Sequence, residues 1–217
     1  MKENQFFWNR FTAMPVIGIM RNFSHTDIEN ILTVYAKSGL NTIEITMNST
    51  GAAESIRFAT DNYGETLNVG AGTVCTEKDL DVALNAGAKF IVTPIVNIAI
   101  IERCNMLSVP VFAGAYTPTE IFTAWNAGAD MVKVFPMVGN AVEYIKAVRG
   151  PLPHIKLLPT GGINIENCTE FFKAGSSGIG VGGQLFDKEY INKKNWSGLA
   201  NVFASFVNKI KPVIGFK

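Results

Sequence analysis

The feature that most constrains the fold of this chain is a series of short apolar runs that recurs along its whole length. Each run is continuously apolar and rich in β-branched residues, which is typical of parallel strands with both faces buried. Eight runs in 217 residues, 217/8, are about 27 residues apart, enough for one strand and one helix each. They are VIGIM (16–20), TIEIT (42–46), LNVGA (67–71), KFIVT (89–93), VPVFA (109–113), MVKVF (131–135), IKLLP (155–159) and GIGVG (178–182).

Helix signals lie between these runs. Three segments resemble capping boxes, in which a Thr side chain and an acidic side chain three residues later satisfy the first N–H groups of a helix. They are Thr26-x-x-Glu29, Thr76-x-x-Asp79 and Thr117-Pro118-Thr119-Glu120. Glycines that can end a helix follow at 38–40, 86–90, 127–131 and 174–178.

Eight strand–helix units predict an α/β fold, specifically a (β/α)8 TIM barrel that forms a single domain over residues 1–217. We expect an extra N-terminal helix within residues 1–14 to close the barrel bottom, and residues 199–211 to form the last helix. A doubly wound open sheet also alternates strands and helices and is the alternative. The even spacing of the runs favours the closed barrel.

Charge and cysteine content restrict the partners and the compartment. Lys and Arg number 19 and Asp and Glu 18, so the net charge of +1 indicates no general attraction to nucleic acid or membranes. Small molecules or further copies of the chain are the expected partners. Three scattered cysteines without a C-x-x-C pair argue against a disulfide framework and fit a reducing cytoplasm. The polar N-terminus does not resemble a signal peptide, and no apolar run approaches the ~20 residues of a membrane span.

Two charged residues stand at the centre of apolar runs. They are Lys133 in MVKVF and Glu44 in TIEIT. Such residues are rarely buried fully unless they are paired or functional. Burial favours the neutral amine of lysine, which can form a Schiff base with a carbonyl substrate, and a nearby carboxylate can move protons. The two residues predict aldolase chemistry, with a purely structural ion pair as the alternative.

Small polar and glycine residues follow three of the predicted strands, at the barrel end where active sites lie. Thr73 follows the third run, Thr160, Gly161 and Gly162 follow the seventh, and the segment 180–184 ends the eighth. Backbone N–H groups in turns of this kind can bind phosphate. The alternative is that the glycines only form tight turns.

Metal ligands are not evident in the sequence. His25 and His154 stand in polar loop contexts and are expected at the surface, and no His, Asp or Glu cluster has metal-ligand spacing. We therefore expect no metal and no cofactor.

Seven motifs occur in the order and spacing of a known enzyme family. They are IEIT (43–46), VGAGTV (69–74), FIVTP (90–94), FAGAYTPTE (112–120), VKVFP (132–136), PTGGI (159–163) and GVGG (180–183). From about Arg21 to Phe186, the chain resembles the class I aldolases that cleave 2-keto-3-deoxy-6-phosphogluconate (KDPG) and 4-hydroxy-2-oxoglutarate (KHG).

This resemblance implies a role for each candidate residue. Lys133 would form the Schiff base and Glu44 would act as general acid and base. The implied substrate contacts are Thr73, Pro94 and Phe135 around the pyruvyl group, Thr160 beside them, Arg21 at an anionic group, and Gly161, Gly162, Gly182 and Gly183 at phosphate. The resemblance also implies a homotrimer that works without a metal.

Two positions depart from the family pattern. Asn48 stands where many gluconate-type members have arginine, and an amide cannot make the bidentate carboxylate contact of a guanidinium. A branch acting on the galactonate epimer has a similar EITLNS pattern, so the preferred epimer stays open. We expect Asn48 to contact substrate, and the alternative is that it caps a helix beginning near Gly51. Gln184 stands where serine is common.

The sequence thus predicts a metal-independent carbon–carbon lyase. The expected reaction splits a 2-keto-3-deoxy sugar acid phosphate into pyruvate and glyceraldehyde 3-phosphate, or 4-hydroxy-2-oxoglutarate into pyruvate and glyoxylate. The alternatives are a non-catalytic sensor of a phosphorylated metabolite and a sugar-phosphate isomerase or epimerase on the same barrel.

Overall fold

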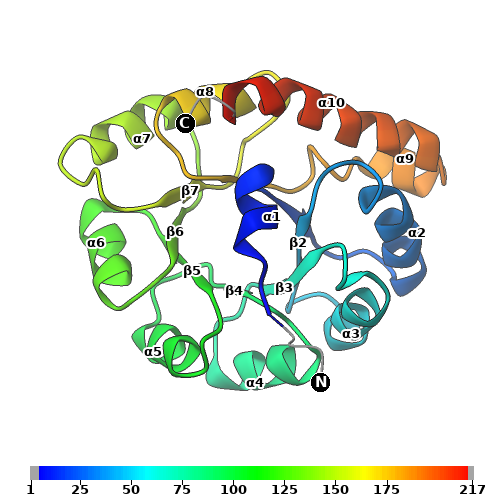
Figure 1. The fold of residues 1–217 in the computed structure, drawn as a ribbon, viewed down its shortest axis with the longest axis horizontal. Coiled ribbons are helices and arrows are strands. Elements are labelled where there is room, and N and C mark those ends of the chain that lie inside the picture. Colours follow the sequence, from blue (N-terminus) through cyan, green and yellow to red (C-terminus); the bar gives the residue numbers. More distant parts are fainter. Residues whose placement is uncertain (1–4, 215–217) are drawn as a thin grey trace.

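Eight parallel strands form the centre of the molecule in the computed structural model, which describes residues 5–214. The strands are β1 (Val16–Met20), β2 (Thr42–Thr46), β3 (Asn68–Gly72), β4 (Ile91–Val92), β5 (Val111–Ala115), β6 (Met131–Val134), β7 (Leu157–Pro159) and β8 (Ile179–Val181). Each strand from β1 to β6 pairs with the next one in the chain, and β8 pairs with β1 (Figure 1). In a doubly wound sheet, the strand order would instead change direction partway across the sheet. The predicted (β/α)8 TIM barrel is confirmed.

The ring of strands is joined least firmly between β7 and β8, a place we call the seam. These strands are linked by an isolated bridge between Thr160 and Gly180 and by a 2.9 Å hydrogen bond from Ser177 N–H to the Leu157 carbonyl. A side chain at position 180 would collide with Thr160, since an added Cβ would lie 2.4 Å from Thr160 Oγ1. Glycine at this position therefore allows the two strand ends to meet.

Helices surround the barrel, as Figure 1 shows. Those described are α1 (Trp8–Ala13), α2 (His25–Tyr35), α3 (Ala52–Tyr63), α4 (Glu77–Asn85), α5 (Ile98–Met106), α6 (Pro118–Asn126), α7 (Ala141–Arg149), α8 (Cys168–Lys173), α9 (Lys188–Asn192) and α10 (Trp196–Ile214). The apolar faces of α2 to α10 pack on the outside of the strands in one large core cluster. The predicted last helix, 199–211, lies within α10. Within residues 5–214, no helix combines the length and apolar character that crossing a bilayer requires.

Two of the three predicted capping boxes are confirmed. Thr76 and Asp79 cap α4, and Thr117 and Glu120 cap α6, with proline at its first position. The prediction for Thr26 was wrong, because Ser24 is the N-cap of α2. The segment also contains Ser-x-x-Asp, and the Ser24 hydroxyl both accepts from Asp27 N–H and donates to the Asp27 carboxylate.

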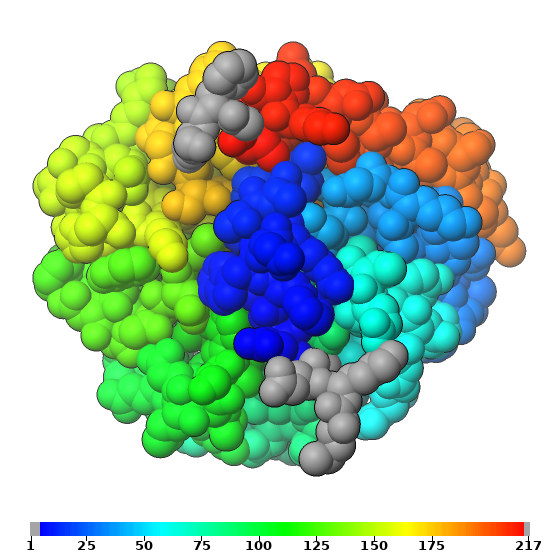
Figure 2. Space-filling view, in the orientation of Figure 1, coloured from blue at the N-terminus to red at the C-terminus, as the bar shows by residue number. Residues whose placement is uncertain are grey.

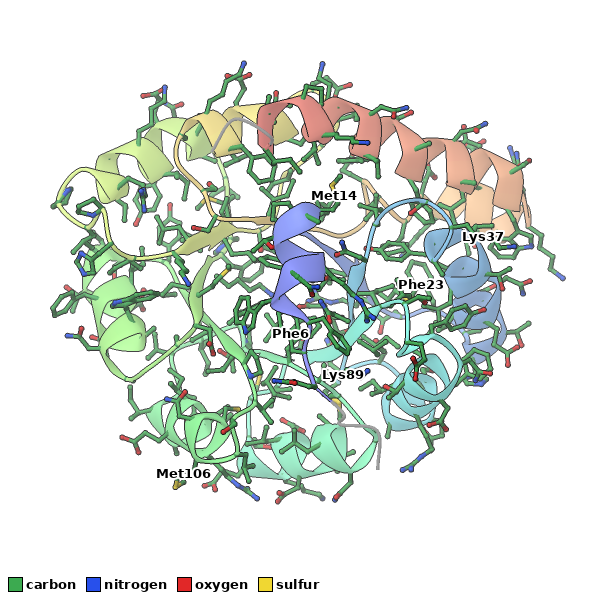
Figure 3. All side chains as sticks on the ribbon, in the orientation of Figure 1. Phe6, Met14, Phe23, Lys37, Lys89 and Met106 are labelled. Carbon is green, nitrogen blue, oxygen red and sulfur yellow. The ribbon has the colours of Figure 1, made fainter. Side chains whose placement is uncertain are left out.

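The first described residues lie across the N-terminal end of the barrel, where Figures 1 and 2 show α1 in blue over its centre. Phe6, Trp8 and Phe11 pack there with Phe90 and Phe112 from the starts of neighbouring strands. Figure 3 shows Phe6 near the middle of the ring. The helix expected within residues 1–14 is α1, and residues 1–4 lie outside the described part of the chain.

Candidate active site

Lys133 and Glu44 meet inside the barrel. Lys133 lies on β6 and Glu44 on β2, strands that are not neighbours, so their side chains can only approach through the barrel interior. Lys133 Nζ is 3.8 Å from Glu44 Oε1, and the two residues are 3% and 1% exposed. Lys133 pairs in register with Gly114 of β5, which has no side chain to compete for this space. The two charged residues selected from the sequence therefore form one buried pair.

The Glu44 carboxylate is held in an environment that suits a base. Its Oε1 atom accepts no hydrogen bond from any residue between 5 and 214. Burial raises the pKa of Glu44, and the positive charges of Lys133 and Arg21 oppose that rise. Gly72 makes room for the carboxylate, because a Cβ at that position would lie 2.3 Å from Oε1. A buried carboxyl whose pKa is raised can take up and return a proton closer to neutral pH.

A cavity of about 210 Å³ opens beside Lys133 at the carboxyl ends of the strands. It is lined by eight of the twelve residues predicted for the site: Arg21, Lys133, Phe135, Thr160, Gly161, Gly162, Gly182 and Gly183. These residues come from β1, β6, β7, β8 and the segments that follow them, so the cavity spans the seam. The Lys133 amine also lies 5.4 Å from the centre of the Phe135 ring.

The glycines after β7 take conformations that other residues rarely adopt. Gly161 has a φ of 97° and Gly162 a φ of 64°. A side chain on Gly162 would also collide with the Met137 carbonyl, 2.8 Å from an added Cβ. Tight turns thus require these glycines, and the same absence of side chains leaves the cavity wall open to a ligand. Both sequence interpretations are compatible with this geometry.

Four predicted site residues do not line the cavity. Glu44 is connected to the cavity by its ion pair with Lys133. Thr73 is connected to it by a 3.4 Å hydrogen bond from Arg21 Nη2 to Thr73 Oγ1. Thr73 has a φ of 54°, an uncommon conformation for a β-branched residue that is often found at functional sites. Pro94 packs its backbone against Gly114, where an added Cβ would lie 2.2 Å from the Pro94 carbonyl carbon.

Asn48 is exposed in the turn after β2. It does not cap a helix, because the N-cap of α3 is Gly51, with a φ of 70°. The helix-capping alternative for Asn48 was therefore wrong.

Three cavity residues were not selected from the sequence, namely Ile19, Ile163 and Gly180. Ile19 could have been found, because it lies two residues before Arg21 and alternate residues of a strand share a face. Gln184, singled out only as a departure from the family pattern, also lines the cavity.

Metal-binding clusters are absent from the described part of the chain, where no three His, Cys, Asp or Glu side chains gather in a suitable arrangement. His25 instead lies 3.2 Å from the Ser55 hydroxyl and 3.6 Å from Glu29, while His154 packs against Trp125.

A larger hollow of about 850 Å³ lies beside α3 and α4, away from Lys133. Its lining includes Lys89, whose amine donates to the Gly64 carbonyl at 2.9 Å and whose pKa is lowered by burial. Arg57 and Lys89 are balanced there by Asp61 and Glu65, so the lining has no net charge to select an ion. Active sites of TIM barrels lie at the carboxyl ends of the strands, which favours the smaller cavity.

Comparison with known proteins gives a consistent result. Residues 8–202 match the family model for KDPG and KHG aldolase. The chain is 34% identical over 176 residues to 2-dehydro-3-deoxy-6-phosphogalactonate aldolase of Escherichia coli strain K12, covering 81% of this chain and 86% of that one. It is also 34% identical over 204 residues to 2-dehydro-3-deoxy-phosphogluconate aldolase of Haemophilus influenzae, covering 93% and 95%.

Among solved structures, one described as native KDPGal is similar over 98% of this chain and 100% of its own, with a TM-score of 0.87 at 29% sequence identity. The solved structure has the same overall fold as this chain. The chain belongs to the KDPG and KHG aldolase family.

Proposed function

We propose that this protein is a class I aldolase that forms a Schiff base through Lys133. Its substrate is a 2-keto-3-deoxy sugar acid phosphate, either KDPG or its galactonate epimer, which it splits reversibly into pyruvate and glyceraldehyde 3-phosphate. Cleavage of 4-hydroxy-2-oxoglutarate to pyruvate and glyoxylate is the same chemistry on a shorter substrate. The observation that carries this proposal is the buried Lys133 amine, which lies 3.8 Å from Glu44 Oε1, an oxygen that accepts no hydrogen bond within residues 5–214, and which lines a cavity.

The reaction begins when Glu44 takes a proton from Lys133 and the neutral amine of Lys133 attacks the C2 ketone. The protonated Glu44 returns this proton to the departing hydroxyl of the carbinolamine, and loss of water gives an iminium ion, which is the electron sink for the next step. Glu44 accepts the proton of the C4 hydroxyl, the C3–C4 bond breaks, and its electron pair moves toward the iminium nitrogen. The aldehyde leaves, and the enamine that remains takes up a proton at C3. Hydrolysis of the new iminium releases pyruvate and restores the lysine.

The surrounding residues bind and orient the substrate in this proposal. Arg21 holds an anionic group, since it lines the cavity at the end of β1 and carries a guanidinium. The backbone N–H groups of Gly161, Gly162, Gly182 and Gly183 hold phosphate, supported by the open cavity wall around them. Thr73, Pro94, Phe135 and Thr160 surround the pyruvyl group, and Asn48 contacts a hydroxyl further along the substrate.

We further propose that the protein acts as a single-domain subunit of a cytoplasmic homotrimer. Exposed apolar side chains after β4, β5 and β6 support association, namely Ile95, Ile98, Tyr116 and Val138. Three free cysteines are consistent with a reducing compartment. Light scattering of the purified protein tests the trimer, and a monomeric mass at working concentration would refute it.

Borohydride reduction in the presence of pyruvate tests the central proposal. Reduction should inactivate the enzyme and leave a stable pyruvyl adduct on Lys133, because the Schiff base becomes a secondary amine that cannot hydrolyse. Lys133→Arg keeps a positive charge but has no nucleophilic amine, so it should form no adduct and release no pyruvate. An adduct mapped to another lysine would contradict the assignment.

The same preparation separates the alternatives. Pyruvate release from KDPG, its galactonate epimer and 4-hydroxy-2-oxoglutarate is expected of an aldolase. A sensor would bind these compounds without turnover, and an isomerase or epimerase would convert them without producing pyruvate.

A further inference from the structure

Two buried hydroxyl groups connect the end of β2 to the loop that carries Arg21. The hydroxyl oxygens of Thr46 and Ser49 are 2.9 Å apart, and both residues are buried. The backbone N–H of Asn22 donates to Ser49 Oγ at 2.9 Å, which links segments 27 residues apart. Ser49 is itself fixed, because its own N–H donates to the Thr46 carbonyl at 2.9 Å. The hydroxyl of Ser49 is therefore a rigid anchor for the backbone at Asn22.

This anchor lies directly beside Arg21, which lines the cavity. Asn22 has a φ of 57°, in the left-handed region that asparagine adopts more readily than most other residues with a side chain. Arg21 precedes it, and its exposed guanidinium makes a long, 3.4 Å hydrogen bond to Thr73. A hydrogen bond of that length on an exposed side chain constrains the guanidinium weakly. The backbone anchor next to Arg21 consequently contributes to where its side chain points.

We propose that Ser49 is a positioning residue, whose hydroxyl holds the Asn22 N–H and thereby keeps Arg21 directed into the cavity. The inference rests on the proposed role of Arg21 in binding an anionic group of the substrate. Without the Ser49 hydroxyl, the loop after β1 loses its partner and Arg21 samples more orientations. Substrate binding must then order the loop, which weakens binding, while the chemistry at Lys133 is unaffected.

The test compares Ser49→Ala with two other variants in steady-state kinetics on whichever of KDPG and its galactonate epimer the wild type cleaves faster. For Ser49→Ala we expect KM to rise roughly three- to tenfold, the worth of one hydrogen bond, and kcat to change by less than about twofold. Ser49→Thr retains the hydroxyl and should have the KM of the wild type. Thr42→Val removes another buried hydroxyl of β2, at the opposite end of the barrel, and should leave KM unchanged.

Folding and chemistry are checked separately. Thermal unfolding reports whether each variant is folded, and borohydride trapping of saturating pyruvate on Lys133 should be as complete in Ser49→Ala as in the wild type. Should Ser49→Ala not fold, Ser49→Cys takes its place, because a thiol has similar size but is a weak hydrogen-bond acceptor. The same rise in KM is then expected.

The variant Arg21→Ala distinguishes failure of this inference from failure of the proposed function. If Ser49 acts through Arg21, then Ser49→Ala should raise KM little further in an Arg21→Ala background. If the two substitutions raise KM independently, so that their factors multiply in the double variant, the positioning role is overturned. A wild-type KM in Ser49→Ala, together with a raised KM in Arg21→Ala, would overturn it as well. A normal KM in Arg21→Ala would refute the role of Arg21 and this inference together, yet leave the Lys133 assignment to the trapping experiment.

Discussion

Glu44 Oε1 lies 3.8 Å from Lys133 Nζ and has no hydrogen-bond donor within residues 5–214. A buried carboxylate oxygen without a donor is costly, and in native proteins such an atom calls for an explanation. Gly72 leaves space for this carboxylate, since any side chain at position 72 would displace it. We propose that the hydroxyl of a bound substrate donates to this oxygen.

Replacing this carboxylate should slow turnover without preventing pyruvate capture. We expect Glu44→Gln to lower kcat by roughly 10²–10⁴-fold, the usual contribution of a positioned proton acceptor. Because burial raises the pKa of Glu44 and its ionised form is the base, wild-type kcat/KM should fall as the pH is lowered, with a midpoint above 4.5. The variant should lack this acid limb. An unchanged kcat, or a midpoint below 4.5, would leave Glu44 as a structural partner of Lys133.

Asn48 links a single side chain to the choice of substrate. Its amide can hydrogen-bond a hydroxyl but cannot neutralise a carboxylate, so discrimination should depend on hydroxyl stereochemistry. We expect the galacto-configured phosphate to be cleaved at least as well as the gluco epimer, and Asn48→Arg to shift the ratio of kcat/KM values toward the gluco substrate. Thr50→Arg adds the same charge to the same exposed turn and should leave the ratio unchanged. A ratio unmoved in Asn48→Arg would remove this residue from the site.

How far the sequence predicts the site depends on the kind of residue. Lys133 and Glu44 could be found because a charge inside an apolar strand has few structural uses. Ile163 could not, because an apolar residue on a cavity wall looks like any core residue. The contact between Asn22 and Ser49 was equally hidden, since it joins two loops and involves a backbone N–H.

At the scale of elements, β1 and β2 match the predicted runs, and the other six strands begin or end one or two residues away from them. Hydrogen bonding explains two of these differences. The fifth run was predicted at 109–113, whereas β5 is Val111–Ala115, because Pro110 has no N–H to donate and contributes only its carbonyl, to Ile91. The fourth run was predicted at 89–93, but β4 is shortened to Ile91–Val92. Beyond it, Gly114 N–H donates to the Thr93 side chain instead of the backbone.

The close packing of β4 against β5 gives a prediction for Gly114→Ala. An added Cβ would lie 2.2 Å from the Pro94 carbonyl carbon and 2.5 Å from its oxygen, and backbone atoms cannot move aside easily. We expect the free energy of unfolding, measured by urea denaturation, to fall by about 1–3 kcal/mol or more. Gly183→Ala is the matched control, because nothing lies within 4 Å of its added Cβ. Equal stability of the two variants would contradict the packing argument.

At the scale of the whole molecule, the two ends of the barrel differ in how they are filled. Aromatic side chains around α1 fill the N-terminal end, and the opposite end contains the cavity beside Lys133. The sequence predicted the first end as a helix within residues 1–14 that closes the barrel bottom, and the clustered aromatic residues of this segment find their apolar partners there. The cavity at the other end could not be predicted in detail, since its shape depends on how four strand ends meet.

This separation predicts that stability and catalysis respond to different substitutions. Phe11 is fully buried and packs against Phe112, so Phe11→Ala should lower the free energy of unfolding by about 3–5 kcal/mol. KM should stay unchanged at a temperature where the variant is folded, because Phe11 lies at the far end of the strands. Met106→Ala, at a position 78% exposed and at the rim in Figure 3, should alter stability by no more than about 0.5 kcal/mol. A raised KM in Phe11→Ala would show that the two ends are coupled.

The seam between β7 and β8 gives the substrate a second role. The cavity extends across it, with Gly161 and Gly162 on one side and Gly182 and Gly183 on the other. A phosphate held as proposed would fasten these two sides together where the strands themselves share few hydrogen bonds. The barrel wall is weakest along the seam in the absence of a ligand, and a bound substrate would stabilise the folded enzyme by linking the two sides.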